Sequence, residues 1–172
     1  METMIMRIME VQTPAGTLLL GGCGEELCLC EWAESPHADA TVARVARRLG
    51  AQFVSGRSRV CGMAAEQLAE YFAGTRKSFD LPLLMAGTDF QKAVWTELLH
   101  IPYGTTITYG QEAQRLGRPA ATRAVASANG ANPLCVIVPC HRVVGAGGTL
   151  TGYSAGLSFK RYLLDLEGAG KS

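Results

Sequence analysis

Three side chains able to do chemistry stand side by side in this chain: the thiol of Cys140, the imidazole of His141 and the guanidinium of Arg142. They follow an apolar run, residues 136–138, whose composition is typical of a buried strand, and Pro139 predicts the point where that strand stops. A strand end presents a nucleophile rigidly, and neighbouring cationic groups lower the pKa of a thiol, whose thiolate is the reactive form. A structural cysteine is the alternative, because free cysteine is among the most buried residue types. The motif by itself leaves both interpretations open.

The elements that must position this motif are mostly helical. Hydrophobic spacing, capping residues and helix breakers predict four helices: from Thr88 or Asp89 to Leu98, over residues 109–116, from Pro119 onward, and over residues 157–167. The second and third are short and separated by Gly117, which is the outline of a helix-turn-helix. In the last helix, Phe159, Leu163 and Leu166 are expected on one buried face.

The first half of the chain has a different pattern. Alternating and β-branched runs predict strands over residues 5–11, 17–20 and 26–32, and helical spacing predicts helices over 40–49 and 62–72, the latter with a stripe of Met63, Leu68, Ala69 and Phe72. Residues 77–88 contain Pro82 and are expected to be an extended connection. We therefore predict an α+β protein with an N-terminal sheet-and-helix subdomain over residues 1–85 and a helical subdomain over residues 86–172.

Length and composition limit the possible classes of protein. The chain has 172 residues, of which 48% are hydrophobic and 18% charged, a typical globular balance. No run approaches the roughly 18 apolar residues that span a bilayer, and Glu2, Arg7 and Glu10 interrupt any apolar leader core. Six cysteines without a paired framework are typical of a reducing compartment. We expect a cytoplasmic protein that is not bound to a membrane.

The charge distribution favours a nucleic-acid partner, although the net charge is only +1. Residues 1–85 hold eight basic and ten acidic side chains, whereas residues 86–172 hold eight basic and five acidic ones. Between Gln111 and Arg161 there are six basic residues and one acid, Glu112. A local basic patch is what phosphate binding requires, although a solvated face of mixed charge is an equal alternative.

The helix that begins near Pro119 is rich in alanine and therefore slender, which suits the minor groove of DNA. Alanine is also the best helix former, which explains most alanine-rich helices. Arg123 is the one long side chain in its middle, and a single protruding side chain can act as a wedge that unstacks a base.

Several motifs taken together resemble the O6-alkylguanine-DNA alkyltransferase family. They are Phe90-Gln91-x-x-Val94-Trp95, Ile101-Pro102-Tyr103-Gly104, Thr108-Tyr109, Arg123-Ala124-Val125, Asn132-Pro133, the run from Ile137 through Pro139-Cys140-His141-Arg142-Val143-Val144 to Gly145, Gly152-Tyr153-Ser154, and Lys160-x-x-Leu163-Leu164-x-x-Glu167. The resemblance implies a ribonuclease H-like first subdomain, a helix-turn-helix and no cofactor. It also implies direct-reversal repair, in which an O6-alkylguanine is flipped out of duplex DNA and its alkyl group moves irreversibly to a protein cysteine.

The resemblance also assigns roles to four residues of the reaction centre. Cys140 corresponds to the alkyl acceptor, and His141 corresponds to its base, acting through a water because adjacent side chains on extended backbone point apart. Glu167 would orient His141 and balance its charge. Asn132 would tie together the turns around the site.

Substrate binding is assigned in the same way. Tyr109 would donate a hydrogen bond to the flipped base as negative charge develops on the leaving guanine. The backbone carbonyls of Cys140 and Val143 would accept from the guanine amino group, Ser154 would help to hold O6, and Tyr153 would form a wall of the pocket.

DNA binding is assigned to three residues in this resemblance: Arg123 as the finger that fills the vacated stack, Arg118 as a neighbouring contact, and Tyr109. Thr122, Ala126 and Ala155 depart from the usual pattern, and they leave the accepted alkyl size and the strength of DNA binding open. The implied partner is duplex DNA carrying O6-alkylguanine, bound by a monomer. Cooperative binding along DNA is left open.

A metal site is one alternative. Cys23, Cys28, Cys30 and His37 could form a four-ligand set, although strand or core cysteines are the stronger interpretation. Some relatives hold zinc in their first domain, and Cys23 and Cys28 lie near two of those ligand positions. We predict no metal.

Three other classes of function compete with repair. A lesion-binding relative without chemistry would lack the nucleophile, whereas Cys140 is present. A cysteine hydrolase would need a base that faces the thiol directly and an oxyanion hole. A helix-turn-helix regulator would leave Cys140, His141 and Glu167 unexplained.

Overall fold

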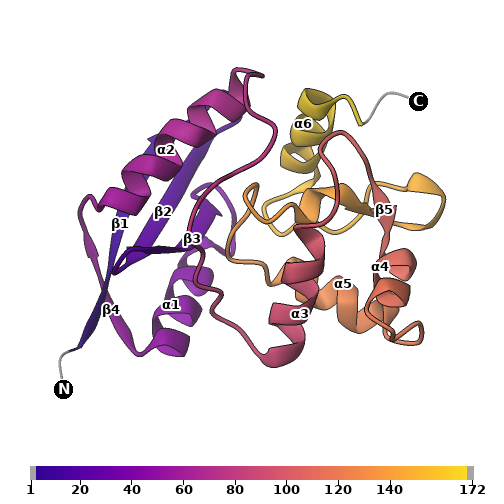
Figure 1. Cartoon of the computed structure of the whole chain (residues 1–172), viewed down its shortest axis with the longest axis horizontal. Helices are drawn as coiled ribbons and strands as arrows, with labels where there is room; N and C mark the ends of the chain where they lie inside the picture. The colour runs from indigo at the N-terminus through magenta and orange to yellow at the C-terminus, as the bar shows by residue number, and fades with distance from the viewer. Residues whose placement is uncertain (1–2, 170–172) are drawn as a thin grey trace. The chain divides into compact units, whose positions relative to one another are not determined.

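The structure of the chain is a computed structural model that describes residues 3–169 (Figure 1). It comprises two compact units, and the division falls after Gly87, close to the sequence expectation of residue 85. No helix in residues 3–169 has both the length and the apolar character that crossing a bilayer requires.

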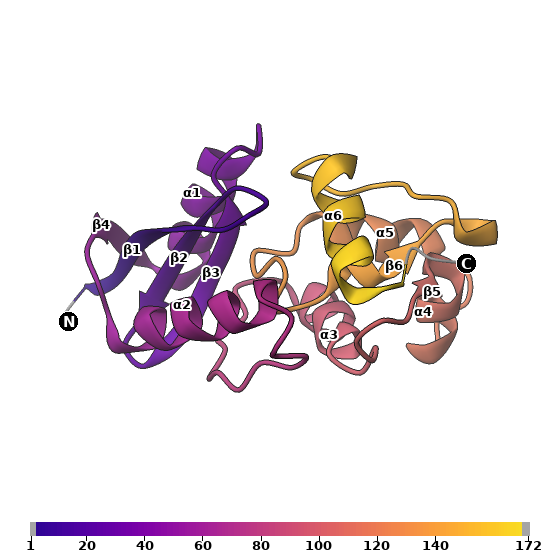
Figure 2. The same ribbon diagram turned by 90° about the horizontal axis from the view of Figure 1, so that it is seen from above.

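The first unit is a four-stranded sheet with two helices. Its elements are β1 (Met4–Gln12), β2 (Thr17–Cys23), β3 (Glu26–Trp32), α1 (Ala38–Leu49), β4 (Ala51–Ser55) and α2 (Arg59–Phe72). The strand order is β3-β2-β1-β4, in which β1 pairs antiparallel with β2 and parallel with β4. Figure 2 shows α1 and α2 on opposite faces of this sheet. The three strands and two helices expected from the sequence are thus confirmed.

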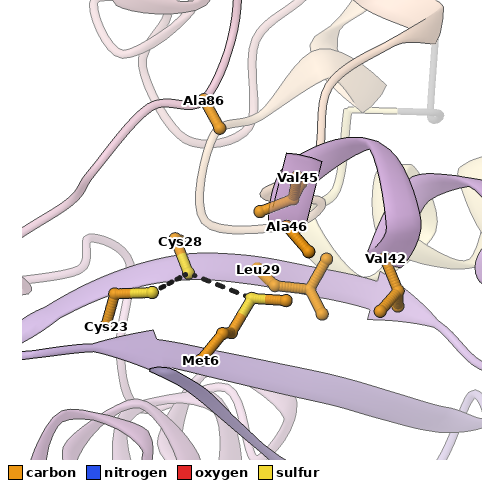
Figure 3. Close-up of a cluster of buried hydrophobic side chains, with 8 residues drawn as sticks. All are labelled: Met6, Cys23, Cys28, Leu29, Val42, Val45, Ala46 and Ala86. Carbon is orange, nitrogen blue, oxygen red and sulfur yellow. Dashed lines mark hydrogen bonds between the residues drawn. The ribbon is translucent and has the colours of Figure 1, made fainter. Parts of the chain in front are cut away.

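The core between the sheet and α1 is apolar and rich in sulfur (Figure 3). Its fully buried members include Met6 on β1 and Cys28 on β3, which pack with Val45 of α1. The helical spacing predicted for this helix is therefore the spacing that fills the core.

Three details of the first unit differ from expectation. The helix α2 begins at Arg59, because the Ser58 hydroxyl caps it by accepting from the backbone N–H of Cys61 at 3.3 Å. The expected stripe was partly wrong, since Met63 and Ala69 are exposed. The buried face consists of Val60, Cys61, Ala64, Leu68, Tyr71 and Phe72. The edge strand β4 was missed, because four of its five residues are exposed and it shows no apolar alternation.

The second unit consists of four helices, a two-stranded sheet and two short 3-10 helices. Its elements are α3 (Asp89–Leu98), β5 (Ile107–Thr108), α4 (Tyr109–Arg115), α5 (Thr122–Gly130), η1 (Cys140–Arg142), β6 (Val143–Val144), η2 (Ala146–Gly148) and α6 (Leu157–Glu167). The strands β5 and β6 pair parallel. This content agrees with the predicted α+β class.

Local signals determine where these helices begin. Thr88 and Thr108 cap α3 and α4 through capping boxes, in which the third helical residue, a glutamine, bonds back to the capping N–H. The helix α5 begins at Thr122, three residues after the expected start at Pro119, which lies in a turn. The fully buried indole of Trp95 on α3 donates to the Ala128 carbonyl at 2.8 Å and holds α5 in place.

The buried face of α6 also differs from expectation. It consists of Lys160, Leu163, Leu164 and Glu167, whereas Phe159 and Leu166 are only partly buried. Two ionisable residues occupy core positions of this helix, and simple hydrophobic spacing does not predict that.

The strand predicted over residues 136–138 does not exist; the segment is a series of tight turns. The Ile137 N–H bonds to the Cys135 carbonyl at 2.8 Å, which is a γ-turn around Val136, and Val136 has a φ of 72°. No other non-glycine residue within 3–169 has a positive φ, and a β-branched residue in that region is strained. A second, inverse γ-turn follows at Pro139 (φ −82°, ψ 64°). A short buried apolar run carries no periodicity that separates a strand from such turns.

Candidate active site

The turns before Cys140 are held by one buried amide. Asn132 donates from Nδ2 to the Val138 carbonyl at 2.8 Å, and its Oδ1 accepts from the backbone N–H of Leu134 at 2.9 Å. The side chain thus links the start of the segment to its end, and only 2% of the residue is exposed. Buried backbone groups that no strand satisfies are satisfied here by a side chain.

Cys140 and His141 lie on η1 and not at the end of a strand. Successive side chains on a 3-10 helix are about 120° apart, so the thiol and the imidazole diverge. The expected divergence of the two side chains is therefore retained for a different reason. Cys140 is 6% exposed and His141 is fully buried.

The imidazole of His141 is oriented by a carboxylate. Its Nε2 lies 2.8 Å from Glu167 Oε2, while its Nδ1 is buried and has no hydrogen-bond partner within residues 3–169. Burial lowers the pKa of His141, and this effect outweighs the opposing hydrogen bond and charge of Glu167. A neutral ring that donates from Nε2 to a carboxylate carries an unprotonated Nδ1, so His141 holds a free acceptor for a proton.

Glu167 is ionised because four donors surround it. Besides His141, it accepts from Arg142 Nε at 2.8 Å and Nη2 at 3.0 Å, and from the Gly104 N–H at 3.2 Å. Burial opposes ionisation, but the hydrogen bonds from His141 and Arg142 hold the pKa of Glu167 well below its usual range. Gly104 has a φ of 79°, and a Cβ there would lie 3.1 Å from the Glu167 carbonyl oxygen, so this donor requires glycine.

Arg142 therefore acts as the hydrogen-bonded counter-ion of Glu167. Its Nη1 donates to the Ile101 carbonyl at 2.7 Å, and its guanidinium stacks over the ring of Tyr103. The sequence interpretation, in which this arginine sits beside the thiol to lower its pKa, is replaced by one in which it anchors the carboxylate.

A second buried cation was missed by the sequence interpretation. Lys160 is fully buried, and its Nζ donates to the carbonyls of Val143 at 2.6 Å and Thr151 at 2.7 Å. Burial lowers its pKa to about 8, while the charge of Cys140 acts to raise it. Its position in the sequence could have predicted its burial, because residue 160 shares one face of a helix with residues 163, 164 and 167.

Tyr109 lies next to this lysine. Its hydroxyl donates to the backbone carbonyl of Thr151 at 3.1 Å or of Gly152 at 3.3 Å, and Lys160 Nζ lies 3.4 Å from its oxygen. Burial and the charge of Cys140 raise the pKa of Tyr109 to about 12. A Cβ at Gly152 would lie 3.1 Å from the Tyr109 oxygen. The charge of Cys140 thus acts on two groups that can donate hydrogen bonds, Tyr109 and Lys160.

The other expected substrate contacts lie in the segments that bond to Lys160 and Tyr109, one around Val143 and one around Gly152. Tyr153 is 8% exposed and Ser154 is half-buried, and both directly follow Gly152. The Val143 carbonyl already accepts from Lys160, so a second donor would have to use its remaining lone pair.

The two arginines expected to contact DNA are exposed, and they lie on α5 and on the turn before it. Arg123 extends from the first turn of α5, and the guanidinium of Arg118 lies 5.5 Å from the ring centroid of Phe90. Glu112, the single acid of residues 111–161, is fully buried. Two of the six basic residues, Arg142 and Lys160, are buried as well, so the exposed charges of this stretch are four arginines: Arg115, Arg118, Arg123 and Arg161.

The alternative metal site gains no geometric support. Cys23 and Cys28 lie with their sulfurs 3.8 Å apart, but residues 3–169 contain no group of three or more His, Cys, Asp or Glu that could hold a metal.

The chain is similar to known proteins over most of its length. A family model described as 6-O-methylguanine DNA methyltransferase, DNA binding domain, matches residues 89–169. A methylated-DNA–protein-cysteine methyltransferase from Methanosarcina barkeri is 43% identical over 157 residues, which are 91% of this chain and 94% of the relative. One from Shigella flexneri is 41% identical over 170 residues, which are 95% and 98% of the two chains.

Solved structures show the same similarity in three dimensions. The crystal structure of Mycobacterium tuberculosis OGT in complex with DNA matches with a TM-score of 0.81 and 42% identity, and the match covers 96% of this chain and 93% of that chain. The similarity thus includes both units.

Proposed function

The chain belongs to the methylated-DNA–protein-cysteine methyltransferase family, the O6-alkylguanine-DNA alkyltransferases, and on this premise we propose that Cys140 is the residue that accepts the alkyl group. The protein is a transferase of direct-reversal DNA repair, and DNA is its partner. The remaining question is which of its side chains perform each step.

The observation that carries the assignment is the buried, unpartnered Nδ1 of His141, the residue that follows Cys140. The thiol gives its proton, through a water, to Nδ1, and the resulting imidazolium is stabilised by the ionised Glu167. The thiolate then attacks the alkyl carbon: a sulfur–carbon bond forms, the bond between that carbon and O6 breaks, and the guanine leaves with the electron pair. Arg142 keeps Glu167 ionised and in place throughout.

Charge that develops on the leaving guanine meets a donor in Tyr109. Lys160 lies close enough to donate to the oxygen of Tyr109, which frees the O–H of Tyr109 to turn from a backbone carbonyl to the base. Ser154 and Tyr153 contribute to the same pocket, and the carbonyls of Cys140 and Val143 accept from the guanine amino group.

Asn132 serves this chemistry indirectly. It holds the turns that end at Val138, two residues before the thiol, so the position of Cys140 depends on a single buried amide. The strained φ of Val136 lies inside the same closed segment.

DNA binding is the task of α4 and α5, which we assign as a helix-turn-helix. The four exposed arginines of residues 111–161 have no exposed acid among them, which suits contact with phosphates. Arg123 projects from α5 as the finger that replaces the flipped base, and Arg118 contacts the DNA beside it.

We assign the first unit as a ribonuclease H-like subdomain. The sequence predicted residues 1–85 for it. The strand order β3-β2-β1-β4, with β4 parallel to β1 and α1 between β3 and β4, supports that assignment. A monomeric state and a cytoplasmic location remain predictions from the sequence.

Intact-mass analysis tests the proposal. After incubation with an O6-methylguanine oligonucleotide, the protein should gain one methyl group, and peptide mapping should locate it on Cys140. With excess oligonucleotide the gain should stop at one equivalent, because the thioether offers no leaving group for a second round. Tight lesion binding without a mass gain would identify the chain as a lesion-binding protein, and methyl on another residue would move the acceptor.

The finger has its own test. Arg123→Ala should slow repair of duplex DNA by about tenfold or more, because unstacking costs a few kcal/mol, with much less effect on a free O6-alkylguanine base. Arg48→Ala, at an exposed arginine of the first unit, is the control. Equal losses on both substrates would exclude a finger role for Arg123.

A further inference from the structure

A buried acid without a cationic partner joins α4 to α5. Glu112 is fully buried on α4, and its Oε1 accepts from Asn129 Nδ2 on α5 at 2.8 Å. No basic side chain within residues 3–169 forms an ion pair with it. Burying an unpaired carboxylate is costly, and such a group usually takes up a proton instead.

The polar atoms of Glu112 and Asn129 include more acceptors than donors. Asn129 Nδ2 also donates to the Val125 carbonyl at 2.9 Å, so both of its hydrogens are used. Two acceptors remain, Glu112 Oε2 and Asn129 Oδ1, and both are buried without a hydrogen-bond partner in the described part of the chain. A proton on Glu112 Oε2 supplies the missing donor. Its acceptor would be Asn129 Oδ1, which belongs to the same amide whose Nδ2 already donates to Glu112.

We propose that Glu112 is a neutral carboxylic acid in the folded protein, paired with Asn129 by two hydrogen bonds, and that this pair is a positioning device that holds α4 against α5 and weakens when the proton is lost. The role in DNA binding rests on the proposed function of α4 and α5, whereas the protonation state does not.

The charges around Glu112 agree with a neutral acid. Burial raises its pKa to about 7, with Asn129 opposing, Glu97 of α3 adding to the rise and Arg115 of α4 opposing it. Tyr109, at the start of α4, has its own pKa raised in small part by Glu112. The strands β5 and β6 contain no ionisable residue, and the one charged side chain of α5, Arg123, is exposed.

The pair of Glu112 and Asn129 connects two helices that each carry a residue of the proposed function. The helix α4 begins with Tyr109, and α5 carries Arg123. The bond from Trp95 to Ala128 holds α5 to α3 and does not titrate. Loss of the proton therefore loosens α4 against a fixed α5, because a carboxylate at Glu112 leaves Asn129 Oδ1 without a donor.

The protonation state can be measured directly in the wild-type protein. Side-chain carboxyl NMR with labelled glutamate should show Glu112 titrating near pH 7, and the signal is identified by its absence in Glu112→Gln. Titration at the ordinary carboxyl value of about 4.3 would overturn the proposal.

The positioning role is tested with Glu112→Gln, whose amide N–H replaces the acid O–H at every pH. The affinity of the wild type for an unmodified duplex should fall relative to that of the variant as the pH rises. We expect the ratio of their Kd values to change from about one at pH 5.5 to about fivefold at pH 8.5. Glu97→Gln is the matched control: it should keep the loss of affinity with rising pH, with its midpoint at a lower pH, because the charge of Glu97 helps to raise the pKa of Glu112.

The possible failures are distinguishable. A ratio that stays constant with pH, in a protein that still methylates Cys140, would exclude the positioning role and leave the repair function intact. Absence of methyl transfer by the wild type at pH 5.5 would count against the proposed function, while the NMR titration would still decide the state of Glu112. If Glu112→Gln does not fold, a glutamine amide cannot replace the protonated acid at this position, and that result would overturn the proposal.

Discussion

Cys28 of the first unit and Cys140 of the second are both buried, but their surroundings differ. Cys28 in the first unit is fully buried and Cys140 in the second is 6% exposed. The thiol of Cys28 contacts the sulfurs of Met6 at 3.4 Å and Cys23 at 3.8 Å, within the apolar cluster of Figure 3, and the backbone carbonyl of Gly21 at 3.4 Å. Cys140 precedes His141 and lies near Lys160 and Tyr109.

These surroundings act on the thiols in different ways. Burial raises the pKa values of Cys28 and Cys30 well above the ordinary thiol value, so both stay protonated. Around Cys140, a neutral imidazole with a free Nδ1 can take the proton, and Lys160 can compensate the charge that remains. Burial alone therefore makes a cysteine part of the core, whereas a set of buried polar groups suits Cys140 to the proposed role of nucleophile.

Deleting the thiol in each unit should give the largest contrast. Cys140→Ala should abolish alkyl transfer while it leaves binding to the alkylated duplex largely intact, because the alanine removes only the attacking atom. Cys28→Ala should still gain one methyl group. Intact mass and a gel-shift assay measure the two properties. Any remaining transfer in Cys140→Ala would place the acceptor elsewhere.

Removing the carboxylate behind His141 should have the next largest effect. Glu167→Gln cannot stabilise the imidazolium, so the single-turnover rate should fall by about 10²–10⁴-fold. Asp165→Asn, at an exposed position on the same helix, is the control and should leave the rate unchanged. A rate in Glu167→Gln within twofold of the wild type would show that the proton leaves Cys140 by another route.

The same substitution should reduce stability in a pH-dependent way. At pH 7 it leaves Arg142 buried without its counter-ion, a loss of about 3 kcal/mol in the free energy of unfolding. The pKa of Glu167 is lowered from 4.5 by folding, so its contribution is present above pH 4.5 and is lost as the pH falls below that value. Denaturant titrations of both proteins should therefore converge in acid. A difference that does not depend on pH would indicate a packing effect.

The smallest expected effect is on the stability of the first unit. Cys28→Ala removes one buried sulfur and should cost about 1 kcal/mol, without a change in the rate of alkyl transfer. Equilibrium unfolding and the single-turnover assay measure the two. A fall in the transfer rate would show that the cysteines of the first unit are not independent of the site.

The sequence predicted best the features that depend on neighbouring residues. Thr88 begins α3 as expected, because its capping box is a local interaction that involves Gln91. The sequence missed β4, whose residues become a strand only by pairing with β1. It also wrongly predicted a strand over 136–138, because an apolar run shows that a segment is buried and not which backbone bonds it makes.

The candidate site divides in the same way. The order of Cys140 and His141, and the place of Glu167 on the last helix, could be read from the sequence through the family resemblance. Which groups face one another could not. Arg142 contacts Glu167, Lys160 turns inward to two carbonyls, and Glu112 meets Asn129, in each case across at least 9 positions of the chain. The sequence alone thus determined which reactive groups are present. The tertiary structure decided their protonation and partners, because both depend on burial and on contacts between residues far apart in the chain.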